Sequence, residues 1–88
     1  MSTNDDSHSL IARVYDAPGL GMTVRVLRVE RGWTQADLAE WLGVHRVTVA
    51  KLERGGAVDL PLAMRAIALL DGVVEIRTRS GRKAPPDA

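Results

Sequence analysis

Apolar residues recur at helical spacing in the centre of the chain and predict a series of short helices. The expected helices run from Leu20 to Arg31, from Gln35 to about Leu42, from His45 or Arg46 to about Arg54, and onward from Asp59. A glycine follows each of the first three, at positions 32, 43 and 55, where a left-handed residue commonly ends a helix. The central pattern therefore predicts an all-α fold.

Two helix starts carry specific capping signals. Thr34 is a candidate N-cap with Asp37 at the third helical position, which is a variant of the capping box. Trp33 and Leu38 flank this start at the spacing of a hydrophobic staple. Asp59 is a candidate cap for the last helix, with Pro61 in the first turn, where a missing N–H costs little.

The residues after the last helix follow a different pattern. Asp71 and Gly72 signal a turn, and residues 73–78 (VVEIRT) are β-branched and partly alternating, which predicts a short strand. A strand needs partners for its backbone groups. Two candidates exist: residues 10–15 (LIARVY) of the same chain, or residues 73–78 of a second copy.

Composition narrows the class of protein. With 88 residues, 45% of them hydrophobic, the chain can build one domain, which we place at residues 10–79. We expect residues 1–9 and 80–88, which lack an apolar pattern, to be disordered tails. Cysteine is absent, and the two histidines belong to no ligand cluster, so neither a metal nor another cofactor is expected. A polar, acidic N-terminus and the lack of long apolar runs favour a cytosolic protein.

The stretch Gln35 to Arg54 is the most informative part of the chain. Small Ala39 and Gly43 allow the two helices in it to cross closely, and its spaced apolar residues supply their contact. The other residues of the second helix have no core to face; they are His45, Arg46, Val47, Ala50 and Lys51. The net charge of +1 is uninformative, but residues 24–54 hold six basic and four acidic side chains.

At this point a family resemblance is clear. The ordered pattern LR…RGWTQ…LA…LGV…TV…LERG between residues 27 and 55 resembles the XRE family of helix-turn-helix domains, the Cro/cI-repressor type. The resemblance implies a lambda-repressor-like bundle of four to five helices, and it covers about residues 18–70. It also implies that the helix from Arg46 to Arg54 is the recognition helix, with its N-terminal end in the major groove.

The resemblance assigns DNA contacts within this motif. Arg46 and Val47 are expected to face base edges, and a guanidinium matches guanine O6 and N7. Thr48 is expected at a phosphate or a thymine methyl group. His45 either contacts a base or caps its helix. The remaining predicted contacts, all to the DNA backbone, are Gln35, Lys51 and Arg54.

Other residues receive structural or partner roles. The resemblance implies a structural ion pair between Arg28 and Glu53 inside the domain. Trp41 lies off the apolar face, and we expect it either to pack against the N-terminal segment or to mark a partner-binding patch. A basic run near the C-terminus is either solvated or in contact with DNA or a partner; it comprises Arg77, Arg79, Arg82 and Lys83.

Residues 15–33 and 59–78 are similar to HipB-type antitoxins. That similarity implies a homodimer in which a C-terminal strand pairs with its copy; its residues are Val73, Val74, Glu75, Ile76, Arg77 and Thr78. A two-fold dimer reads palindromic operator DNA. The similarity further implies a repressor that autoregulates its operon and neutralises a HipA-like kinase toxin.

Alternative functions remain open on the sequence. A phage repressor or a restriction–modification regulator would have the same fold, and so would a protein-interaction adaptor that does not bind DNA. An enzyme is not expected, because the chain shows no nucleophile–base arrangement, no paired carboxylates and no phosphate-binding loop.

Overall fold

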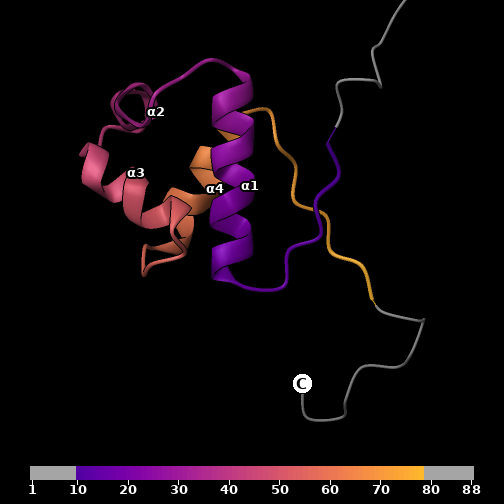
Figure 1. Cartoon of the computed structure of the whole chain (residues 1–88). Coiled ribbons are helices and arrows are strands. Elements are labelled where there is room, and N and C mark those ends of the chain that lie inside the picture. Colours follow the sequence, from indigo (N-terminus) through magenta and orange to yellow (C-terminus); the bar gives the residue numbers. More distant parts are fainter. Residues whose placement is uncertain (1–9, 79–88) are drawn as a thin grey trace, which may run out of the picture.

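The computed structural model describes residues 10–78, which contain four helices and no strand (Figure 1). The helices are α1 (Ala17–Glu30), α2 (Gln35–Leu42), α3 (Arg46–Glu53) and α4 (Leu60–Leu69). The all-α prediction is therefore confirmed for this range. The expected tails, residues 1–9 and 80–88, lie outside the described residues, as do Arg79, Arg82 and Lys83 of the basic run.

Helix α1 begins three residues earlier than the apolar pattern predicts. Asp16 is its N-cap, and the carboxylate accepts a hydrogen bond of 2.8 Å from the backbone N–H of Gly19. Pro18 falls in the first turn, where its lack of an N–H is harmless. Asp16 and Pro18 define this start, and the apolar pattern did not predict it because neither residue is part of the apolar repeat.

The predicted caps of α2 and α4 are present. The N–H of Asp37 donates to Oγ1 of Thr34 (3.0 Å), and the N–H of Thr34 donates to a carboxylate oxygen of Asp37 (2.9 Å), which completes the capping box. At α4, the N–H of Leu62 donates to the carboxylate of Asp59 (2.8 Å). These bonds satisfy backbone donors that the first helical turn leaves without partners.

The core draws on all four helices. Val24 of α1, Leu38 of α2 and Val49 of α3 are completely buried, and α4 contributes a run of buried small and aliphatic residues. The core residues are Val24, Leu38, Ala39, Leu42, Val49, Leu52, Leu62, Ala63, Ala66, Ile67 and Leu70. Trp33, Val44 and other partly buried side chains pack around them.

Two glycines permit the close approach of α1 to the end of α3. A Cβ on Gly21 would lie 2.5 Å from the backbone oxygen of Glu53, and one on Gly55 would lie 2.5 Å from Cα of Pro18. Gly55 also has φ of +82°, a left-handed conformation that only glycine adopts without strain. Backbone contact at this point anchors α3 on α1.

The short strand predicted at residues 73–78 is absent from the described chain. We call residues 10–15 the N-terminal flank and residues 73–78 the C-terminal flank. Helix α4 ends in a turn in which the N–H of Gly72 donates to the carbonyl of Ile67 (2.8 Å), and the C-terminal flank leaves without entering a ladder. A strand requires a neighbour that supplies inter-strand hydrogen bonds, and residues 10–78 offer none at this place. In Figure 1 the two flanks lie on the opposite side of α1 from α2 and α3.

Candidate nucleic-acid interface

A tight turn joins α2 to α3. Gly43 ends α2 with φ of +72°, and the N–H of Val44 donates to the carbonyl of Ala39 (3.0 Å). The N–H of Thr48 then donates to the carbonyl of His45 (2.9 Å) as α3 begins. The turn sets α3 across α2 and presents the start of α3 at the surface (Figure 1).

Helix α3 has one buried and one exposed side. Val49, Leu52 and Glu53 are buried, whereas the first residues of the helix and its later basic residues are not. The structure brings most of the predicted DNA-contact residues together on this exposed side; they are His45, Arg46, Val47, Lys51 and Arg54, with Thr48 partly buried beside them. Val47, a hydrophobic side chain, is 62% exposed, so it is available for an apolar contact.

The expected ion pair between Arg28 and Glu53 is present, and it joins α1 to α3. Nε of Arg28 donates to Oε2 of Glu53 (2.6 Å), and Nη2 donates to Oε1 (3.0 Å), so the contact is bidentate. Nη1 donates to the carbonyl of Trp33 (2.7 Å), in the loop before α2. Both side chains are more than 90% buried. The hydrogen bond to Glu53 raises the pKa of Arg28 above its ordinary value, although burial opposes this shift.

Gln35 connects the buried ion pair to the exposed side of α3. Its Nε2 donates to Oε1 of Glu53 (3.1 Å), and its Oε1 accepts from Nη1 of Arg46 (3.0 Å). A chain of hydrogen bonds thus runs from Arg28 through Glu53 and Gln35 to Arg46. Sequence reasoning assigned Gln35 only a phosphate contact, because no local spacing relates position 35 to positions 46 and 53. The link arises from the packing of α2 against α3.

His45 and Trp41 had alternative roles on the sequence. His45 occupies the N-cap position of α3, but its side chain makes no capping hydrogen bond and is exposed. Trp41 is 65% exposed and stacks on Trp33, with ring centroids 6.2 Å apart and an interplanar angle of 13°. Within residues 10–78, the aromatic partner of Trp41 is therefore Trp33. The guanidinium of Arg31 lies 5.7 Å from the Trp33 ring.

No group of three or more histidine or acidic side chains within residues 10–78 could hold a metal ion. No helix there is long and apolar enough to cross a membrane.

Comparison with known proteins identifies the family. Residues 20–73, more than half of the chain, match the family described as "Helix-turn-helix domain". The chain belongs to this family, which confirms the helix-turn-helix prediction. No curated protein matches the sequence.

Solved structures show the same fold. A HipB variant in an O2 20mer complex aligns with a TM-score of 0.72 at 21% sequence identity, over 81% of this chain and 100% of that one. The chain in the HipA–HipB–O2–O3 complex aligns with a TM-score of 0.71 at 20% identity, over 80% of this chain and 100% of that one. These similarities establish a HipB-like fold for the helical part of the chain.

Proposed function

We propose that the protein is a sequence-specific, DNA-binding transcriptional repressor that acts as a homodimer on palindromic operator DNA. The observation that carries this proposal is the exposed start of α3, where Arg46 and Val47 project and Lys51 follows one turn later. Arg46 is held by Gln35, so its guanidinium is partly oriented before any ligand arrives. A pre-positioned guanidinium is suited to bidentate recognition of guanine in the major groove.

The backbone contacts follow from the same geometry. Lys51 and Arg54 flank the exposed side of α3 and add positive charge for phosphates. The capping box does not use the N–H groups of Gln35 and Ala36, which lie at the positive end of the α2 dipole, where an anion is favoured. Affinity is then mainly electrostatic, whereas Arg46, Val47, Thr48 and His45 supply sequence preference.

We further propose that this repressor is the antitoxin of a toxin–antitoxin pair and that it neutralises a HipA-like kinase. The support is the HipB-like fold, together with the solved complex that names HipA beside HipB. The C-terminal flank would pair with its copy in the dimer, which gives its unpaired backbone groups a partner.

The test is quantitative DNA binding. The full chain is titrated against the duplex upstream of its own gene and against a shuffled duplex of equal length, at several salt concentrations. We expect preference for the upstream duplex, with an affinity that falls steeply as salt rises. Equal binding to both duplexes, or no binding to either, would refute the repressor function, and the second result would favour an adaptor. The antitoxin role is tested separately, by co-expression with any kinase-like protein encoded beside this gene. An antitoxin should form a stable complex with that protein, whereas a phage or restriction–modification regulator should form none.

A further inference from the structure

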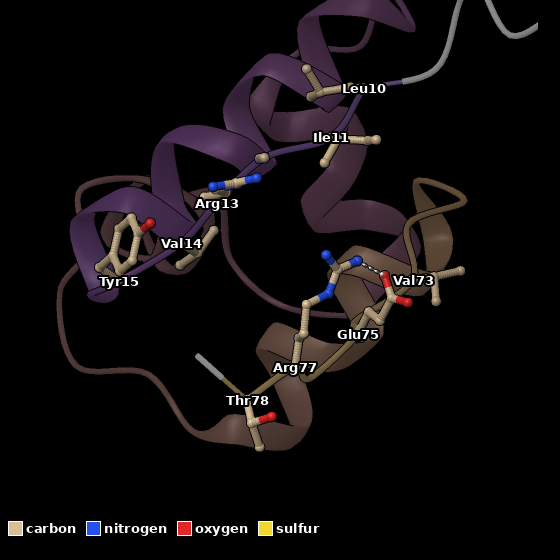
Figure 2. Close-up of a pocket in the computed structure, with 10 residues that line it drawn as sticks. Leu10, Ile11, Arg13, Val14, Tyr15, Val73, Glu75, Arg77 and Thr78 are labelled. Carbon is tan, nitrogen blue, oxygen red and sulfur yellow. Dashed lines mark ion pairs between the residues drawn. The ribbon is translucent and has the colours of Figure 1, made fainter. Parts of the chain in front are cut away.

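The two flanks enclose a groove of about 900 Å3 on the side of α1 that faces away from α2 and α3 (Figures 1 and 2). Residues 10–15 line one wall of the groove. Alternate residues of the C-terminal flank, Val73, Glu75 and Arg77, line the other wall with Thr78. Figure 2 shows that the flanks are separated along their length and do not touch as neighbouring strands would.

Within residues 10–78, both flanks have backbone groups without hydrogen-bond partners and apolar side chains that are exposed to solvent. Among the described residues, neither 10–14 nor 73–78 makes a backbone hydrogen bond. Both flanks also expose large apolar side chains: Ile11 and Val73, which line the groove, are 90% and 88% exposed, and Ile76 beside them is 92% exposed. Free backbone edges combined with exposed β-branched residues are what an additional strand would cover.

The groove has room for one strand. Strands in a sheet lie about 4.8 Å apart, sheets are about 10 Å thick, and six residues extend about 20 Å, so a six-residue strand takes up roughly 950 Å3. The groove, about 900 Å3 in volume and open to solvent, has room for a segment of this length.

The direction of the two flanks is compatible with an antiparallel strand between them. In both figures the N-terminal and C-terminal flanks run the same way along the groove. A strand antiparallel to one is therefore antiparallel to the other. In a dimer whose two-fold axis is perpendicular to these segments, the C-terminal flank of one copy runs antiparallel to that of its partner.

We propose that the groove receives residues 73–78 of a second copy, so that the dimer is closed by a four-stranded antiparallel sheet. The C-terminal flanks of the two copies form its central strands, and the N-terminal flank of each copy pairs with the C-terminal flank of the other. Residues 10–15 thus become an intermolecular outer strand. The inference rests on the dimer of the proposed function and adds a second segment to its interface.

Charges in the groove agree with this occupant. Arg77 Nη2 lies 3.9 Å from Oε1 of Glu75 in one chain, and both side chains are 78% exposed. If the two-fold axis passes through Ile76, antiparallel pairing sets Glu75 of each copy opposite Arg77 of the other. Arg13 on the opposite wall adds a second cation near the incoming Glu75. In this register, opposite charges therefore face each other at positions 75 and 77.

Disulfide trapping tests the arrangement cleanly, because the natural chain has no cysteine. Adjacent antiparallel strands place paired Cα atoms about 4.5–5.5 Å apart, within disulfide reach, whereas segments separated by one strand are about 9.6 Å apart and out of reach. Chains carrying Arg13→Cys or Ile11→Cys are each mixed with a chain carrying Glu75→Cys and oxidised. Glu40→Cys on α2, mixed with Glu75→Cys, is the matched control.

We expect a covalent heterodimer in at least one of the first two mixtures, identified by mass spectrometry, and none in the control. The double variants Arg13→Cys/Glu75→Cys and Ile11→Cys/Glu75→Cys should give linked dimers and no internally bonded monomer. An internal bond in monomers would show that the flanks pair within one chain, and absence of both products would also overturn the proposal. Light scattering and operator binding of the same preparations distinguish these results from failure of the dimer or of the repressor function.

Amide hydrogen exchange on the unmodified chain is an independent test of the four-stranded sheet. If residues 73–78 are central strands, consecutive amides are protected, because hydrogen bonds form on both edges. If they pair only with their own copy, every second amide exchanges freely, and that alternating pattern would contradict the outer strand. Dilution below the dimer dissociation constant should remove the protection in the first case.

Discussion

The helical part of the chain, residues 17–70, buries its apolar side chains and pairs its buried charges within one copy, whereas the two flanks do not. Within the helices, apolar side chains are buried together, three helices have side-chain caps, and the buried charges of Arg28 and Glu53 neutralise each other. The flanks retain exposed apolar residues, and residues 10–14 and 73–78 make no backbone hydrogen bond within the described part of the chain. The helices contain the information for a complete fold, whereas the flanks leave exposed apolar surface, which our proposal assigns to pairing with a second copy.

The same contrast exists on a smaller scale within α3. Its inner side is held by the core and by the ion pair, and its outer side contacts little of the protein. Gln35 links the two sides, because it bonds both to buried Glu53 and to exposed Arg46. A change on the inner side should therefore alter stability, and a change on the outer side should alter recognition alone.

The largest effect is expected from Glu53→Ala. The substitution leaves the buried guanidinium of Arg28 without a counter-charge and should lower the free energy of unfolding by about 3–5 kcal/mol. Urea denaturation followed by circular dichroism measures the change. Glu40→Ala, an exposed glutamate of α2, is the control and should shift stability by less than about 0.5 kcal/mol. A loss below about 1 kcal/mol for Glu53→Ala would mean that the pair does not hold α3 in place.

Next in size is Arg46→Ala, on the outer side of the same helix. We expect a loss of about 1–3 kcal/mol in binding free energy for the operator, with relaxed sequence preference. The free energy of unfolding should stay within about 0.5 kcal/mol of the natural value, because Arg46 is exposed. Gel-shift competition with operator variants measures discrimination, and Arg25→Ala, an exposed arginine of α1, is the charge-matched control. Unchanged discrimination in Arg46→Ala would remove Arg46 from direct readout.

A third prediction concerns the C-terminal flank and its proposed pairing with a second copy. Glu75→Arg and Arg77→Glu should each weaken self-association several-fold, because like charges then face each other across the two-fold axis, at about 0.2–1 kcal/mol per pair. An equal mixture of the two variants should form heterodimers, since opposite charges at positions 75 and 77 then face each other again across the interface. Analytical ultracentrifugation measures all three samples. If the mixture associates no better than the separate variants, this register is wrong.

The smallest effect is expected at the exposed end of α4. Asp71 pairs with Arg31 (2.5 Å), but its side chain is 85% exposed, and exposed ion pairs contribute little. Asp71 also has φ of +60°, a conformation that asparagine tolerates as well as aspartate. Asp71→Asn should therefore change thermal stability by less than about 0.5 kcal/mol in calorimetry. A loss above about 1 kcal/mol would show that this exposed pair belongs to the cooperative core.

Local signals in the sequence predicted much of the helical part. The capping box at Thr34 and Asp37, the cap at Asp59 and the glycine at 43 act over four residues or fewer, so their partners lie within the same short window. The start of α1 was missed because Asp16 and Pro18 are not part of the apolar repeat. The ion pair between positions 28 and 53 came only from the family resemblance.

The sequence alone determined which segments become helices, where they end and which side of α3 is left polar, because these properties depend on nearby residues. Only the tertiary structure decided that Gly21 is the point of backbone contact with α3, that Gln35 links Glu53 to Arg46, and that the two flanks border one groove. These arrangements depend on how distant elements pack. The β-branched pattern of residues 73–78 predicted a strand that one chain does not form, because a strand depends on a neighbour for its hydrogen bonds.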